Sequence, residues 1–318
     1  MATRFSEIPA PELEELVGHS LGTPATIADR RVLRDWEASR VERVVAVVER
    51  TTKQIIVKQV PPSDPEAGIY LALRSSGLSC IPLMHALVRR QDDQVLVIEY
   101  IEGPGLYAMA TQDNYRRAVD QLVMVHSHFW ERRDQLESFG LPLHTGPFLQ
   151  QRSGLALSEC RSRIEERVYS EIRQSHVDEV VPAYEAYVAA LPFVSAQPIT
   201  LVHGDYHFGN IILGHDGTPM IIDWGSAAGG IGLLDLVALL DVAARMGSPV
   251  PDPDDLIGRY FDGTRQRIGP WITRSNYQRL FGLCQATRSF EELNWFNSSG
   301  EDYGARALRE LKIIHEAV

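Results

Sequence analysis

The residues that could do chemistry gather in one short stretch of the chain, which reads His203-Gly204-Asp205-Tyr206-His207-Phe208-Gly209-Asn210. A further carboxylate, Asp223, follows an apolar run and precedes Trp224-Gly225. Carboxylate and amide oxygens are the ligands that a hard cation prefers, and a carboxylate can also take a proton from a hydroxyl group. If these side chains meet, they can place oxygen ligands and a proton acceptor around a single point.

Short apolar runs surround these residues and must position them. Ile199–Val202 leads into the loop, Ile211–Leu213 leads out, and Met220–Ile222 ends at Asp223. We predict a short strand for each run, with a hairpin turn at His215-Asp216-Gly217-Thr218. This hairpin would return Asp223 toward Asn210, and loops on a rigid scaffold commonly carry chemistry.

The first hundred residues have the pattern of a β-rich lobe. A short amphipathic helix is expected at residues 11–20, and Asp64 with Pro65 can begin a helix that runs to about Ser76. Glu102-Gly103-Pro104-Gly105 is typical of a linker. Strands are predicted at 26–33, 41–48, 55–60, 83–89 and 95–101.

Beyond the linker the apolar residues follow a helical period. Residues 140–147 form an expected loop. The sequence therefore predicts two domains, an N-terminal lobe at 1–101 and a C-terminal lobe at 102–318. Helices are predicted at 114–133, 149–174, 177–191, 233–246, 254–263, 273–297 and 304–318.

Composition limits the partners. The 318 residues carry a net charge of −11, from 31 basic and 42 acidic side chains, and most of the excess acid follows Ile101. This argues against nucleic-acid binding, which needs a basic surface, and favours a cationic or neutral small molecule; ordinary solubility charge is the alternative. With no bilayer-length apolar run, no signal-peptide pattern and three widely spaced cysteines, we expect a cytoplasmic protein without membrane contact or disulfides. The oligomeric state stays open.

Lysine is rare in this chain and its positions are therefore informative. The three lysines are Lys53, Lys58 and Lys312, and the other basic residues are arginines. Strand alternation places Lys58 on the same face as Ile56 and Val60. Lys58 is a candidate phosphate ligand, and a solvated strand edge is the alternative.

The motifs His203-Gly204-Asp205-x-His207-x-x-Asn210 and Asp223-Trp224-Gly225 resemble those of the aminoglycoside phosphotransferase and choline kinase-like family. The resemblance runs from Val57 to about Leu240. It implies an α+β, bilobal protein kinase-like fold, with a β-rich N-lobe that has one helix and a mainly helical C-lobe that carries the catalytic hairpins.

The resemblance also implies an activity. Members of this family are small-molecule kinases, so the chain would transfer the γ-phosphate of Mg-ATP to a hydroxyl of an aminoglycoside-like antibiotic, an amino sugar or an amino alcohol. Asp205 would orient the hydroxyl or accept its proton, while Asn210 and Asp223 would hold Mg²⁺. A role of these residues as turn formers is the alternative.

The nucleotide contacts follow from the same resemblance. Lys58 would contact the α- and β-phosphates and Glu66 would fix this lysine, although a first-turn glutamate also suits the helix dipole. The backbones of Glu99 and Ile101 would bind adenine. The loop at 36–40 lacks the usual glycines, so Ser39 would contact the phosphates, and the choice between ATP and GTP stays open.

Other polar residues have weaker patterns. We expect His203 and His126 to be structural, and Asp235 to tie the loop after Asp223-Trp224-Gly225 to the following helix. His207 lies close enough to the motif to contact substrate. An acidic substrate pocket is predicted from Asp241, Glu291, Glu292 and Trp295, each of which could instead be a surface residue.

Two alternatives to a small-molecule kinase remain. An atypical protein kinase is disfavoured because only nine residues separate Asp223 from the helix predicted at Leu233, which leaves no room for an activation loop. A pseudokinase that binds nucleotide without turnover is disfavoured because Lys58, Asp205 and the two predicted metal ligands are all present.

Overall fold

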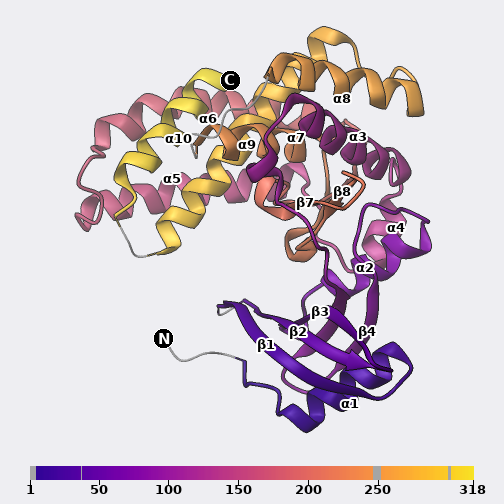
Figure 1. The fold of residues 1–318 in the computed structure, drawn as a ribbon. Helices are drawn as coiled ribbons and strands as arrows, with labels where there is room; N and C mark the ends of the chain where they lie inside the picture. Colours follow the sequence, from indigo (N-terminus) through magenta and orange to yellow (C-terminus); the bar gives the residue numbers. More distant parts are fainter. Residues whose placement is uncertain (1–4, 37, 246–251, 300–301) are drawn as a thin grey trace. The chain divides into compact units, whose positions relative to one another are not determined.

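A computed structural model describes residues 5–36, 38–245, 252–299 and 302–318, which form two compact units (Figure 1). The first unit takes the described residues up to Met109 together with Gly209–Ser226. The second takes Ala110–Phe208 and the described residues from Ala227 onward. This division differs from the predicted lobes, 1–101 and 102–318, because the hairpin that precedes Asp223 packs within the first unit.

The first unit is built on an antiparallel sheet of five strands in the order β1-β2-β3-β5-β4. All five strands were predicted, and they differ from the predicted ranges mainly at their ends. Their bounds are β1 Ala25–Asp35, β2 Arg40–Val48, β3 Thr51–Val60, β4 Met84–Arg89 and β5 Gln94–Glu99.

Helix α1 (Ala10–Leu21) covers one face of this sheet (Figure 1). Its buried Leu13 and Val17 share a core cluster with Ile55 and Val57 of β3. Alternation along β3 therefore turns Lys58 toward the opposite face, as predicted. Both α1 and α2 (Glu66–Ser75) were predicted from the sequence, at residues 11–20 and from Asp64 to about Ser76, whereas the fold implied by the resemblance has one helix in this lobe.

A short hairpin completes the first unit. Strand β7 (Ile211–Leu213) pairs with β8 (Pro219–Ile221). The Leu213 N–H donates to the Pro104 oxygen at 2.9 Å, and the Ile221 N–H donates to the Cys80 oxygen at 2.7 Å. These backbone bonds tie the hairpin to the linker and to the segment before β4, which explains why it belongs to this unit.

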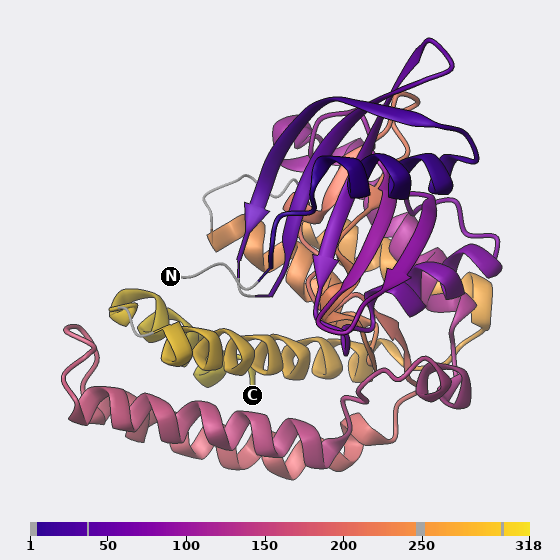
Figure 2. The ribbon, with the colours of Figure 1, turned by 90° about the horizontal axis from the view of Figure 1, so that it is seen from below.

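The second unit is mainly helical. The long helices α5, α6, α9 and α10 pack along one another (Figure 2), while α3 packs on α8 and α7 on α9. Two short strands, β6 (Thr200–Val202) and β9 (Ala228–Gly230), pair beside them. The helices are α3 Gln112–His128, α4 Arg133–Ser138, α5 Gly146–Glu165, α6 Gln174–Ser195, α7 Leu233–Arg245, α8 Pro253–Ile268, α9 Arg274–Ser299 and α10 Gly304–Ala317.

Several features of this unit differ from the sequence prediction, and helix α4 was not predicted at all. Helix α3 ends at His128 because the chain turns at Glu131, which has a φ of 58° and donates its N–H to the Ile199 oxygen. Helix α5 ends at Glu165, where Arg167 has a left-handed φ of 58°, and not at Gln174. Strand β9 was missed because its Ala-Gly-Gly sequence has low strand propensity. The predicted end of α7 at residue 246 lies outside the described residues.

Two predictions from composition can be compared with the structure. Within the described ranges, no helix combines the length and the apolar character needed to cross a bilayer. Cys80, Cys160 and Cys284 are free and buried.

Candidate active site

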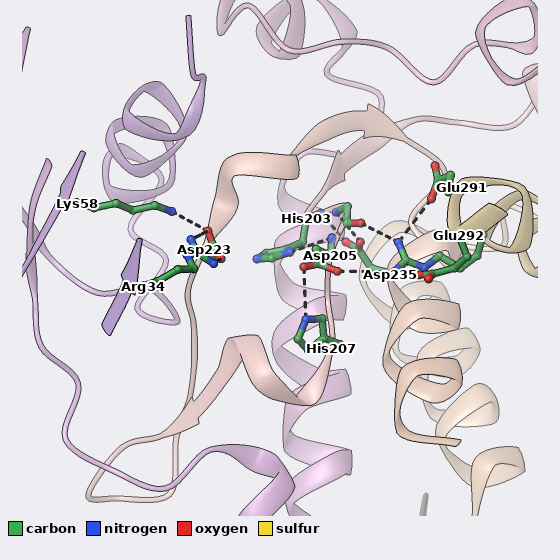
Figure 3. A network of polar contacts seen from close by, with 11 residues as sticks. Arg34, Lys58, His203, Asp205, His207, Asp223, Asp235, Glu291 and Glu292 are labelled. Atoms are coloured by element: carbon green, nitrogen blue, oxygen red, sulfur yellow. Dashed lines mark hydrogen bonds and ion pairs between the residues drawn. The ribbon is translucent and has the colours of Figure 1, made fainter. Parts of the chain in front are cut away.

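Lys58 is the centre of a buried ion cluster in the first unit (Figure 3). Its Nζ lies 2.5 Å from Glu66 Oε2 and 2.6 Å from Asp223 Oδ1. Burial lowers the pKa of Lys58, but the two carboxylates outweigh it, so the pKa is raised and the side chain stays a cation. Glu66 of α2 is the partner that the sequence predicted for this lysine, whereas Asp223 after β8 was predicted as a metal ligand and its contact with Lys58 was not foreseen.

Arg34 at the end of β1 also contacts Asp223, and sequence reasoning missed it. Its Nη1 donates to Asp223 Oδ2 at 2.9 Å (Figure 3). Burial would raise the pKa of Asp223, but Lys58 and Arg34 outweigh it and hold this pKa well below its usual range. Asp223 also has a φ of 65°, a conformation that aspartate tolerates better than bulkier residues.

Asn210 and Asp223 flank the β7–β8 hairpin and line the same cavity. The Ile222 N–H donates to the Asn210 backbone oxygen at 3.0 Å, which keeps the two ends of the hairpin together. No cluster of three or more histidine, cysteine or acidic side chains suited to a metal occurs among the described residues. An amide oxygen and an ionised carboxylate nevertheless fit Mg²⁺ when phosphates and water complete its shell.

The cavity itself has a volume of about 260 Å³ and is walled mainly by apolar side chains of the sheet. Glu99 and Ile101 line it, as the adenine prediction requires. The Glu99 N–H already donates to the Leu83 oxygen at 2.8 Å. Of the two backbone groups of Glu99, the carbonyl oxygen is therefore the one that could bind adenine. The full lining is Leu33, Arg34, Val41, Ile56, Lys58, Glu66, Tyr70, Pro82, Ile98, Glu99, Tyr100, Ile101, Asn210, Ile212, Ile222 and Asp223.

Ser39 has a different contact from the one predicted. Its side chain is buried, and its Oγ accepts a hydrogen bond from Arg34 Nη2 at 2.9 Å. The Trp36 N–H donates to the Ser39 backbone oxygen at 3.0 Å, which closes the turn between β1 and β2. Residue 37 of the predicted loop lies outside the described residues.

The second unit holds the loop that carries Asp205. Gly204 has a φ of 77°, which a residue with a Cβ rarely adopts. The backbone N–H groups of His203 and Gly204 donate to the Asp235 carboxylate at 2.6 and 2.9 Å. Asp235 is therefore structural, as expected, but it holds the loop before Asp205 rather than the one after Asp223.

His126 of α3 holds Asp235 in this position. Its Nε2 lies 3.2 Å from Asp235 Oδ2 and its Nδ1 lies 2.8 Å from the Tyr260 hydroxyl. All three side chains are buried. The structural role predicted for His126 is consistent with these contacts, which fix Asp235 and through it the loop.

Asp205 lies among basic side chains. Its N–H donates to His203 Nδ1 at 3.2 Å, its Oδ2 lies 3.4 Å from His207 Nε2, and its Oδ1 lies 3.7 Å from Arg288 Nη2 (Figure 3). Burial would raise the pKa of Asp205, but the His207 ring and then Arg288 outweigh it and lower the pKa. The side chain keeps 38% of its surface exposed, so this ionised carboxylate can still be reached.

The acidic residues predicted as a substrate pocket come together around two arginines. Arg288 Nη2 lies 2.6 Å from Glu292 Oε1, and its Nη1 lies 3.6 Å from Glu291 Oε2. Arg245 pairs with Asp241 and, more loosely, with Glu292. These acids are therefore already partnered.

Trp295, the fourth residue of the predicted pocket, packs against other aromatic side chains. Its ring centroid lies 5.4 Å from those of Phe296 and Tyr303, so this indole belongs to an aromatic cluster of α9 and the start of α10. About half of the side chain, 54%, remains exposed.

The sequence contains a local signal for Arg288 that was overlooked. Glu291 and Glu292 stand three and four residues after it in α9, which is the spacing of side-chain pairs on one helix face. No comparable local signal marks Arg34, because Asp223 is remote from it in the sequence.

Comparison with known proteins gives a family and a fold. A model of the phosphotransferase enzyme family matches residues 30–271. A comparison with curated proteins found no match to the chain.

Solved structures match the chain over nearly its whole length. The gentamicin complex of APH(2″)-IIa has 16% identity and a TM-score of 0.61, with 97% of each chain covered. A Haemophilus somnus 129PT protein assigned as a fructosamine-3-kinase has 13% identity and a TM-score of 0.59, with 95% of this chain and 96% of that chain covered. Spectinomycin phosphotransferase APH(9)-Ia, in complex with ADP and spectinomycin, has 16% identity and a TM-score of 0.56, with 98% of each chain covered. The five-stranded sheet and the helical second part thus have the protein kinase-like fold of the aminoglycoside kinases.

Proposed function

This chain belongs to the phosphotransferase enzyme family, and from that premise we propose that it transfers the γ-phosphoryl group of Mg-ATP to a hydroxyl group of a small cationic molecule. The observation that carries the proposal is the position of Lys58. This buried cation touches two carboxylates on the wall of a mostly apolar cavity. A cation and metal-binding oxygens beside an apolar slot are what a purine nucleotide with its phosphates requires.

The first unit would bind the nucleotide. Lys58 donates to the phosphates, Asn210 and Asp223 hold Mg²⁺, and the Glu99 carbonyl and Ile101 N–H bind the base. When bound, Mg²⁺ neutralises charge on the phosphate oxygens. GTP is the alternative nucleotide for the same apolar slot. Affinities measured for Mg-ATP and Mg-GTP decide which of the two the protein uses.

The second unit would bind the acceptor. Asp205 is ionised and exposed enough to accept a hydrogen bond from the acceptor hydroxyl and to take its proton as the phosphoryl group is transferred. His207 lies beside this carboxylate and can contact the same substrate. Phosphoryl transfer depends mainly on such positioning and on charge neutralisation.

Charge supports a cationic acceptor. The carboxylates of Asp205, Asp241, Glu291 and Glu292 form ion pairs with Arg245 and Arg288, and Arg152 lies near Glu291, so four acids face three arginines. An ammonium group of an aminoglycoside, amino sugar or amino alcohol would balance the remaining negative charge. The exposed ring of Trp295 would form one wall of this acceptor site.

An ATP-consumption screen tests the proposal. The purified protein is incubated with Mg-ATP and with aminoglycosides, other hydroxylated antibiotics, amino sugars or amino alcohols, and products are identified by the mass of one added phosphoryl group. We expect turnover with a cationic alcohol and none when Asp205 is replaced by Asn. Nucleotide binding without turnover of any compound would favour a pseudokinase, and phosphorylation of a protein but of no small molecule would favour an atypical protein kinase.

A further inference from the structure

We propose that Arg34 is a phosphate-binding residue of the nucleotide site, a role that sequence reasoning gave to Ser39. The inference rests on the proposed function, because it names a further contact of the same nucleotide. The ligand class is a nucleoside di- or triphosphate, and the contact is to its β- and γ-phosphate oxygens.

The guanidinium of Arg34 is held at the cavity wall from several sides. Besides the 2.9 Å bond to Asp223 Oδ2, its Nη2 lies 3.4 Å from Asp223 Oδ1 and donates to Ser39 Oγ at 2.9 Å. The Trp36 ring lies 5.3 Å from the guanidinium carbon. The side chain lines the cavity and keeps 27% of its surface exposed. It is therefore positioned in advance and can be reached by a ligand.

The contact with Asp223 alone gives Arg34 little structural purpose. Lys58 already lies 2.6 Å from the same carboxylate, and it is more deeply buried than Arg34. Each side chain of the Arg34–Asp223 pair keeps about a quarter of its surface exposed, 27% and 26%, so a ligand that enters the cavity can reach both. A second cation on one carboxylate is better explained by a ligand that arrives with several negative charges.

Charge accounting leads to the same conclusion. Lys58 and Arg34 face Glu66 and Asp223, and the Asp64 carboxylate lies near the same cluster, so two cations face three acids before any ligand binds. When the predicted metal ligand Asp223 is shared with a divalent cation, Arg34 can turn from that carboxylate to phosphate oxygens in the same cavity. A guanidinium is suited to this exchange because its planar fork pairs with phosphate through two hydrogen bonds.

The turn between β1 and β2 lacks the backbone contact to phosphate that a glycine-rich loop provides, and the Arg34 side chain would supply a contact in its place. In the predicted loop at 36–40 no glycine allows the backbone to approach the phosphates closely. The Ser39 hydroxyl is engaged by Arg34. A side-chain donor at the end of β1 would then replace backbone N–H groups as the phosphate contact.

Binding of a nucleotide series tests the assignment without measuring turnover. Affinities of adenosine, AMP, ADP and ATP, each with Mg²⁺, are measured by titration calorimetry for the wild type and for Arg34→Ala and Arg34→Lys. We expect Arg34→Ala to lose about tenfold to a hundredfold in affinity for ATP and ADP, the usual effect of a hydrogen bond to a charged group. Adenosine should bind as before. Arg34→Lys should recover part of the loss, because a lysine supplies the charge without the fork.

Arg31→Ala is the matched control, because Arg31 is an exposed residue of the same strand. It should leave all four affinities unchanged. The inference is overturned if Arg34→Ala binds ATP as tightly as the wild type, or if adenosine weakens as much as ATP, which would indicate a packing role. If the wild type binds none of the nucleotides, the proposed function itself fails as well.

Discussion

Among the individual side chains, Asp205 has the surroundings of a group that must stay ionised. His207 and Arg288 approach its two oxygens from different sides, and the Asp235 carboxylate fixes the backbone before it. Arg288 also donates to the Gly204 oxygen at 3.4 Å, so one guanidinium contacts both the loop backbone and the carboxylate. These contacts favour a fixed acceptor of a hydrogen bond over a strong base.

Replacement of this carboxylate by its amide should remove proton acceptance while keeping the shape. Asp205→Asn is expected to lower kcat at least ~100-fold, in the range assigned to a positioned base. Affinity for Mg-ATP should not change, because Asp205 and the nucleotide cavity belong to different units. Steady-state kinetics and titration calorimetry measure the two quantities. Asp134→Asn, at an exposed position of α4, is the control, and a kcat within a few-fold of wild type for Asp205→Asn would remove Asp205 from its role.

Glu310 of α10 should make stability depend on pH. Its side chain is only 1% exposed and lies 2.6 Å from Arg245 Nη1. Burial raises the pKa of Glu310 from its ordinary 4.5 to about 7. The folded state therefore binds the Glu310 proton more tightly than the unfolded state does. The stabilisation that results is complete below the ordinary pKa of 4.5 and is lost as the pH rises to about 7.

Glu310→Gln should remove this dependence, because an amide resembles the protonated acid. Relative to the wild type, the variant should gain stability between roughly pH 5 and pH 8, by on the order of 3 kcal/mol at most. Thermal unfolding across this range measures the difference. Glu316→Gln, at an exposed position of the same helix, is the control, and its stability should depend on pH as that of the wild type does. A constant difference between Glu310→Gln and wild type would show that the acid stays ionised throughout.

The β7–β8 hairpin is the element that brings Asn210 and Asp223 together, and its position depends on contacts with the linker. A Cβ at Gly103 would collide with the Leu213 carbonyl oxygen. The backbone of β7 therefore approaches the linker more closely than a side chain would allow. The hairpin has three residues in each strand, so it depends on such outside contacts for its position.

Gly103→Ala should consequently displace the hairpin. We expect a loss of ~1–3 kcal/mol in unfolding free energy, typical of overpacking, and weaker Mg-ATP binding because both predicted metal ligands would shift. Denaturant unfolding and calorimetry provide the two measurements. Gly258→Ala on α8 is the control, since its Cβ would meet nothing within 4 Å and a helix interior favours alanine. Equal nucleotide affinity in both variants would contradict this account of the hairpin.

Considered as one molecule, the chain interleaves its two units. It crosses between them after Met109, after Phe208 and after Ser226. Asp205 and Asn210 therefore belong to different units although one loop of the sequence contains both. Because unfolding of the first unit would release Gly209–Ser226 from the middle of the second unit's sequence, we expect the two units to unfold together.

Ligand linkage tests this expectation. Mg-ATP at 100 times its Kd should stabilise the fold by ~2.7 kcal/mol, and scanning calorimetry should show the rise in Tm as one transition. Asp223→Ala should lose most of the rise, because a metal ligand is removed. Two transitions, of which Mg-ATP shifts one, would mean that the units unfold independently, and an unchanged response in Asp223→Ala would refute the metal assignment.

The sequence by itself determined the features that depend on local pattern. Alternation in β3 was sufficient to put Lys58 opposite the apolar face of Ile55 and Val57, and the motif spacing selected Asp205, Asn210 and Asp223 as candidate site residues. The five strands and most helices followed from periodicity. Helix ends such as Glu165 were less predictable, because a single left-handed residue decides them.

Only the tertiary structure decided which remote residues meet. It placed Arg34 on Asp223, assigned the β7–β8 hairpin to the first unit, and brought Arg288 of α9 to Asp205 and Arg245 of α7 to Glu310 of α10. Local pattern fixes the face on which a side chain lies. The partner of a charged group depends instead on the distance between elements that are far apart in the chain, and packing of the whole fold sets that distance.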